Sequence, residues 1–217
     1  MTYGTSHAVL KPLAEVNTAD PRMEHLIVRR GDDQRKFELS DMHKRVSTIS
    51  IHNGVPPDVQ RQFETARNLM LYTWFVFEFQ TCSEQQAYGA LELALRRRFP
   101  DAKKVVPRKD GTIWETPLTL AGLLQKAFNE KAIIPEQLTA WKRAAANNAA
   151  AQLAESGESI KPISANDWMN DVLKILPNFR NHLAHGEPRL DLFASLQLIE
   201  LCAELINALF PEPENER

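Results

Sequence analysis

The segment "RNHLAH" (residues 180–185) holds the residue types needed to break a phosphodiester bond. The guanidinium of Arg180 is permanently charged, and its planar fork suits phosphate oxygens. His185 stands just before Gly186 and Pro188, which predict a helix end, and the negative end of a helix dipole favours the protonated imidazole. Such a histidine can act as a general acid or base near neutral pH. Asn181 adds a neutral donor and acceptor, so the segment predicts a phosphate-handling site that needs no metal.

The spacing of this motif is moderately informative and points to a paired site. An arginine and a histidine five positions apart are expected roughly 0.4 times by chance in this chain, and an adjoining asparagine lowers this to roughly 0.02. Five residues along an α-helix rotate by about 500°, so the two side chains lie roughly 140° apart. One copy makes a poor site unless the helix ends between Arg180 and His185. Two copies related by a twofold axis could bring both pairs into one cleft.

Other polar and aromatic residues have competing interpretations. His182 lies one turn from His185, a possible metal-ligand spacing, but no third ligand is evident, so we expect it to line the cleft or pack in the bundle, and we expect no metal or other cofactor. Glu92 could face the site and pair with Arg180, although a solvated helix position is the commoner role. Arg96 to Arg98 could guide an RNA backbone or simply close a helix. Four aromatic residues fit the core or an interface better than base stacking: Tyr88, Trp114, Trp141 and Trp168.

The composition is that of a globular chain that can bury a sizeable core. Of the 217 residues, 43% are hydrophobic and 25% charged, and the net charge of −2 excludes a broadly basic nucleic-acid binder. Cys82 and Cys202 lie in apolar stretches and predict buried free thiols in a reducing compartment. The N-terminus lacks the pattern of a signal peptide, and the apolar run 69–77 is too short to span a bilayer. We therefore expect a cytoplasmic protein without membrane contact.

Periodicity predicts an all-α fold with an N-terminal arm. The arm, residues 1–56, is charged, and its short extended-looking stretches, "HLIV" and "VSTISI", predict one or two strands or irregular wraps. Residues 57–210 predict a bundle of five to six helices with short connections, and 211–217 a disordered tail. The expected helices cover about 58–79, 83–98, 118–131, a segment from Pro135 into the alanine-rich tract, a segment from Asn166, and 192–210.

Two features of these helices lead to further expectations. The first expected helix, 58–79, is apolar on all sides, which is typical of a helix at a bundle centre or in a subunit contact. Ser83 and Gln86 form a capping-box pattern that predicts the start of the second helix. The stretch 99–117 between the second and third helices reads as turns.

The sequence "RNHLAH" after an apolar helix, in an all-α chain, resembles the arginine–polar–histidine motif of the HEPN superfamily. Arg180, Asn181 and His185 match the motif. The resemblance implies a cytoplasmic homodimer whose two motifs form a composite, metal-independent endoribonuclease site, in a toxin–antitoxin or phage-defence setting with a possible antitoxin or regulatory partner. The tyrosine found two residues after the histidine in the toxin subgroup is replaced by Glu187, so regulation through that tyrosine is not implied.

The reaction implied by this resemblance is attack of the RNA 2′-hydroxyl on the adjacent phosphorus. One His185 would take the hydroxyl proton, the other would protonate the leaving 5′-oxygen, and the Arg180 pair would stabilise the charged intermediate. The products would be a 2′,3′-cyclic phosphate and a 5′-hydroxyl. The alternative is a non-catalytic helical module that keeps the bundle as a scaffold for binding a partner protein or a nucleotide.

Overall fold

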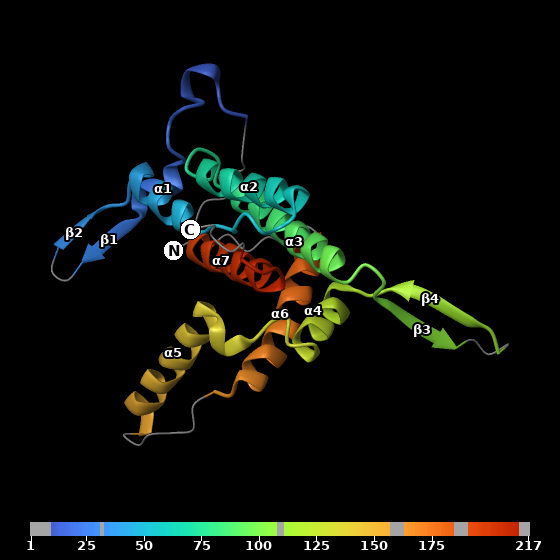
Figure 1. The fold of residues 1–217 in the computed structure, drawn as a ribbon. Coiled ribbons are helices and arrows are strands. Elements are labelled where there is room, and N and C mark those ends of the chain that lie inside the picture. Colours follow the sequence, from blue (N-terminus) through green and yellow to red (C-terminus); the bar gives the residue numbers. More distant parts are fainter. Residues whose placement is uncertain (1–9, 31–32, 108–110, 157–162, 185–190, 213–217) are drawn as a thin grey trace, which may run out of the picture.

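A computed structural model describes residues 10–30, 33–107, 111–156, 163–184 and 191–212. This part of the chain is mostly helical (66%), with seven α-helices and two small two-stranded hairpins (Figure 1). The helices are α1 (Leu39–Thr48), α2 (Pro57–Tyr72), α3 (Phe79–Arg98), α4 (Leu120–Asn129), α5 (Thr139–Ser156), α6 (Ala165–Ala184) and α7 (Leu192–Leu209). The antiparallel hairpins are β1 (Ile27–Arg30) with β2 (Asp33–Lys36), and β3 (Lys103–Pro107) with β4 (Ile113–Pro117). The expected helical fold is therefore confirmed: the described part of residues 57–210 contains six helices, as predicted, while the helix in the arm and the β3–β4 hairpin were not predicted.

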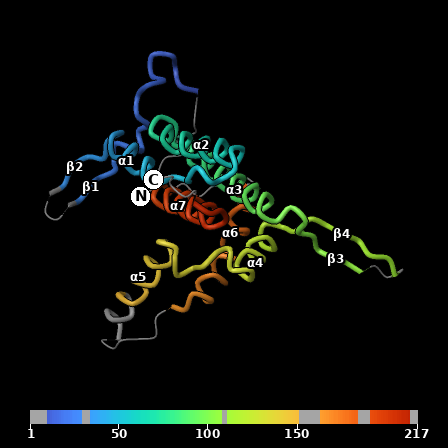
Figure 2. Tube along the Cα trace, viewed as in Figure 1, coloured from blue at the N-terminus to red at the C-terminus, as the bar shows by residue number. Residues whose placement is uncertain are grey.

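The core lies among α2, α3 and α7, which run side by side in the centre of the molecule (Figure 2). Apolar residues three or four positions apart give each helix a buried stripe: Phe63, Ala66 and Met70 on α2; Leu91 and Leu95 on α3; Ile199, Cys202 and Ile206 on α7. Within the described residues, α7 is the helix long and apolar enough to cross a bilayer by length and composition, and half of it is buried inside this fold.

The arm contains a helix where a strand was expected. Glu38 and Asp41 form a capping box at the start of α1, and Met42 and Val46, one turn apart, are buried against the bundle. Val46 begins the stretch "VSTISI", so the expectation of an extended chain is wrong for residues 46–48, whereas β1 begins within "HLIV", as expected. The reciprocal cap and the helical spacing of the two buried residues together favour the helix.

The boundary between α2 and α3 also differs from the expectation. The predicted helix 58–79 ends at Tyr72, and α3 begins at Phe79 rather than at Ser83. The Ser83 hydroxyl is buried inside α3 and donates to the carbonyl of Ala66 on α2 at 2.6 Å, so the predicted cap is wrong. An apolar stretch long enough for one helix instead turns back on itself, because doing so packs α3 against α2.

The C-terminal half follows the sequence prediction closely. Helix α4 lies within the expected segment, α6 begins next to Asn166, and α7 ends next to Phe210. Pro135 opens a short 3-10 turn (Pro135–Gln137), and α5 follows at Thr139. The predicted disordered tail, residues 211–217, falls largely on residues 213–217, which lie outside the described residues.

Candidate functional site

The motif residues Arg180 and Asn181 lie near the C-terminal end of α6. Met169 and Leu176 are fully buried and fix this helix against the bundle. Near the end of α6, the carbonyl of Leu183 accepts a hydrogen bond from the Gln85 amide of α3 at 3.3 Å. The end of the helix is thus held by both packing and a polar contact, which fixes where the motif faces.

Arg180 and Asn181 line a cavity of about 490 Å³ formed by three parts of the chain. Helix α3 contributes Glu92 and Arg96, and α6 adds Pro177 as the third residue from its own turn. The end of β4 and the start of α4 supply the remaining wall: Pro117, Leu118, Thr119, Leu120 and Ala121. The motif is therefore part of a concave surface, as a substrate site requires.

The charges around this cavity favour an anion. The cavity lining includes two guanidinium groups, those of Arg180 and Arg96, and one carboxylate, that of Glu92, which binds Arg96 at 2.6 Å. The first turn of α4 also lines the cavity, and Thr119 caps it by accepting from the Gly122 amide at 3.3 Å. Because the N-terminal end of a helix carries a partial positive charge, it adds to the attraction for phosphate.

The structure brings together part of the predicted site. Arg180, Asn181 and Glu92 line one cavity, and Glu92 forms its ion pair with Arg96. His182 is exposed and does not line this cavity, so neither of its expected places, the cleft and the packed bundle, is found in the described protomer. His185 lies outside the described residues.

One other expectation about individual side chains is wrong, that for Cys82, and of the two places expected for Trp114, the core and an interface, the structure excludes the core. Cys202 is buried as predicted, but Cys82 is exposed, and both are free. Trp114 does not belong to the core: its exposed fraction is 53%, on the β3–β4 hairpin, whereas Tyr88 and Trp168 are buried. The sequence predicts turns for residues 99–117, because the two short strands there are rich in lysine and proline. The hairpin that exposes Trp114 was therefore not predicted.

Sequence reasoning also missed a buried polar cluster between α3 and α7. The Ser195 hydroxyl on α7 lies 2.5 Å from the Glu84 carboxylate and 3.4 Å from the Gln80 side-chain oxygen, both on α3. Burial raises the pKa of Glu84, the Ser195 hydrogen bond opposes this, and the charge of Asp191 adds to the rise. The cluster adjoins Gln85, which contacts the end of α6, so it supports the wall on which the motif lies.

Neither metal clusters nor relatives identify the site. Within the described ranges, no group of three or more histidine, cysteine, aspartate or glutamate side chains could hold a metal ion. No protein-family model, curated protein or solved structure matches this chain. The function must therefore be argued from the residues and their geometry.

Proposed function

We propose that this protein is a metal-independent endoribonuclease whose active site combines residues of two protomers. The observation that carries the proposal is the shared cavity of Arg180 and Asn181, which also holds Arg96 and the first turn of α4. All of these groups favour a phosphate in the same place. The HEPN-like motif supplies the histidine of the proposed chemistry at position 185.

The proposed reaction is transesterification followed by release of the leaving strand. The 2′-oxygen of one nucleotide forms a bond to phosphorus as its proton passes to one His185, and the bond from phosphorus to the 5′-oxygen breaks as the other His185 donates a proton. Arg180 stabilises the charge that develops on the non-bridging oxygens. The products are a 2′,3′-cyclic phosphate and a 5′-hydroxyl, and no redox partner is needed.

Two protomers are part of the proposal because of helical geometry. Arg180 lines the cavity. On an ideal α-helix, side chains at positions 180 and 185 point in directions roughly 140° apart, so one helix does not direct both into the same cavity. A twofold related copy would supply the second imidazole and the second guanidinium to one cleft. A toxin or phage-defence role, with an antitoxin or regulatory protein as a further partner, fits an enzyme of this kind.

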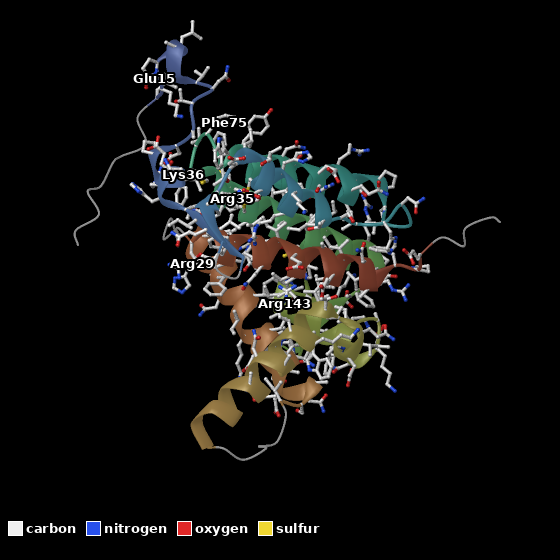
Figure 3. The ribbon with its side chains drawn as sticks, turned by 90° about the vertical axis from the view of Figure 1, so that its left-hand side faces the viewer. Glu15, Arg29, Arg35, Lys36, Phe75 and Arg143 are labelled. Carbon is white, nitrogen blue, oxygen red and sulfur yellow. The ribbon has the colours of Figure 1, made fainter. Side chains whose placement is uncertain are left out.

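The test is RNA cleavage in the presence of EDTA by wild type, His185→Ala, Arg180→Ala and Asn181→Ala. We expect His185→Ala and Arg180→Ala to lower the rate at least 100-fold, as for loss of a general acid–base group, and Asn181→Ala to lower it about tenfold. The matched control is Arg143→Ala, since Arg143 binds Glu200 on α7 and is not part of the cavity lining (Figure 3).

Three results would contradict this proposal. Product strands ending in a 3′-hydroxyl would exclude transesterification through the 2′-oxygen. Cleavage that survives in His185→Ala would assign the activity to another site or to a contaminant. Complete absence of cleavage by a well-folded wild type would favour the non-catalytic binding module.

A further inference from the structure

The β3–β4 hairpin projects away from the helices (Figure 1), and its side chains are open to solvent. The exposed fractions are 56% for Val105, 69% for Ile113 and 53% for Trp114. An isolated two-stranded hairpin is marginally stable in water unless something packs on it. Three large apolar side chains held at the end of such an arm therefore indicate a binding surface rather than a structural element.

The register of the strands divides these residues between two faces. Trp114 lies opposite Val106 and Lys104 lies opposite Thr116, and these two adjacent pairs share one face. The other face carries Val105 and Ile113 together with an ion pair between Lys103 and Glu115, whose Nζ and Oε2 atoms lie 2.9 Å apart. One face thus combines the aromatic ring of Trp114 with Lys104, whose cross-strand neighbour, Thr116, is uncharged. On the other face, the lysine is neutralised by a carboxylate.

We propose that the face formed by Lys104, Val106, Trp114 and Thr116 binds single-stranded RNA and delivers it to the cavity that contains Arg180. The face has the two components of single-strand recognition, an aromatic ring on which a base can stack and a cation for the backbone phosphate. The delivery step rests on the proposed ribonuclease function, whereas the binding step is independent of cleavage.

The hairpin is continuous with the cavity. Pro117, the last residue of β4, lines the cavity, and the three residue steps from Trp114 to Pro117 span about 10 Å of extended chain. A short single strand could therefore contact both. The end of α3, just before β3, adds three exposed arginines, Arg96, Arg97 and Arg98. Arg96 forms an ion pair with Glu92 and Arg97 with Asp58, so the charges of these two are largely balanced where they lie.

A second protein chain fits this face less well than RNA does. Pairing of another strand along the hairpin edges is discouraged by lysines and by Pro107 and Pro117 at the strand ends. A protein interface core is also depleted in lysine, and Lys104 is one of the four side chains of this face. Phosphate, in contrast, complements the lysine, and a base complements the tryptophan.

The binding test uses a fluorescein-labelled 2′-O-methyl RNA, about 12 nucleotides long, within the site size of single-strand binding folds. This probe cannot be cleaved because it lacks the 2′-hydroxyl nucleophile. We expect Trp114→Ala to raise the Kd roughly tenfold and Trp114→Phe to restore most of the affinity, since phenylalanine can still stack. Lys104→Ala should reduce the steepness of the decrease of log affinity with log salt concentration by about 0.7, because one phosphate contact is lost.

The opposite face of the same hairpin supplies matched controls. Ile113→Ala and Lys103→Ala remove side chains of the same kinds from the other face and should leave the Kd within twofold of wild type. If these two variants weaken binding as much as Trp114→Ala and Lys104→Ala do, or if Trp114→Ala leaves the Kd unchanged, the inference is wrong. A change in sedimentation of Trp114→Ala with unchanged RNA binding would instead assign this face to contact between copies.

The design separates this inference from the proposed function. Probe binding that depends on Trp114, in a protein that cleaves no RNA, would support the binding face and contradict the ribonuclease. Cleavage that depends on His185, with binding insensitive to Trp114, would do the reverse.

Discussion

The carboxyl group of Glu84 lies between α3 and α7, where its charged form is disfavoured. Its oxygen accepts from the Ser195 hydroxyl at 2.5 Å, and Asp191, at the start of α7, adds negative charge nearby. Tyr88 and Cys202 adjoin the same buried region, and burial raises the pKa of the Cys202 thiol to about 12. This packing therefore favours the neutral, protonated form of the Glu84 carboxyl group.

The raised pKa of Glu84 gives a predictable pH dependence of stability. Because the folded pKa lies above the unfolded value near 4.5, the folded state binds more protons between the two, and the free energy of unfolding falls as pH rises through this window. Glu84→Gln removes this titrating group. The free energy of unfolding of the variant minus that of wild type should therefore increase as the pH is raised from about 4 to about 8. Each unit of pKa shift corresponds to about 1.4 kcal/mol.

Urea unfolding at the two pH values measures this difference. Glu136→Gln, a change at an exposed position, is the control and should show the same difference from wild type at both pH values. A difference between Glu84→Gln and wild type that is independent of pH would show that the Glu84 carboxyl titrates normally.

At the scale of elements, helices with one strong apolar stripe could be predicted from the sequence. Helix α7 follows the predicted segment to within one residue at its end, and α6 begins one residue before Asn166. The motif residues on α6 could likewise be named, because their side-chain chemistry does not depend on the fold. Their placement in one cavity with Arg96 required the structure, since α3 and α6 are distant in sequence.

The elements that could not be predicted depend on long-range contacts. The break between α2 and α3 falls inside a continuous apolar stretch, and the hydrogen bond from Ser83 to Ala66 forms only after the chain has turned back. The β3–β4 hairpin lacks the alternation of buried and exposed residues that marks a strand, because neither face packs on the core.

Helix α7 also anchors the end of the N-terminal arm through one side chain. The Asn207 side-chain oxygen accepts from the His52 amide at 2.9 Å, and its amide group donates to the Ser50 carbonyl at 3.0 Å. We expect Asn207→Ala to lower the free energy of unfolding by about 1–3 kcal/mol, since two hydrogen bonds are lost. The control is Asn68→Ala, because Asn68 bonds only within α2, to the Glu64 carbonyl. Equal unfolding midpoints for the two variants would contradict this anchoring role.

At the scale of the whole molecule, the arm and the bundle share one core. Met23, Phe37 and Met42 are buried in the same cluster as the residues of α2, α3 and α7. Asp20 adds polar contacts to the turn after α2: its amide donates to the Trp74 carbonyl at 2.8 Å, and its carboxylate accepts from the Phe77 amide at 3.3 Å. The arm therefore completes the bundle, and its strand β2 carries Arg35 and Lys36 (labelled in Figure 3), of which Arg35 forms an ion pair with Asp41 of α1 at 2.6 Å.

A composite active site makes a prediction that only a pair of protomers can test. In a homodimer of Arg180→Ala, or of His185→Ala, both copies of one essential group are missing, and cleavage should be lost. A heterodimer of the two variants, co-expressed with different tags and purified through both, keeps one guanidinium and one imidazole. If both protomers face one cleft, this heterodimer should recover cleavage above either homodimer, by about tenfold or more, because a residual arginine still stabilises the charged phosphorane.

A site built within one protomer has no such route, since each protomer of the heterodimer lacks one of the two groups. Activity equal to that of the inactive homodimers, or a wild type that sediments as a monomer at the concentrations used for cleavage, would rule out the shared cleft.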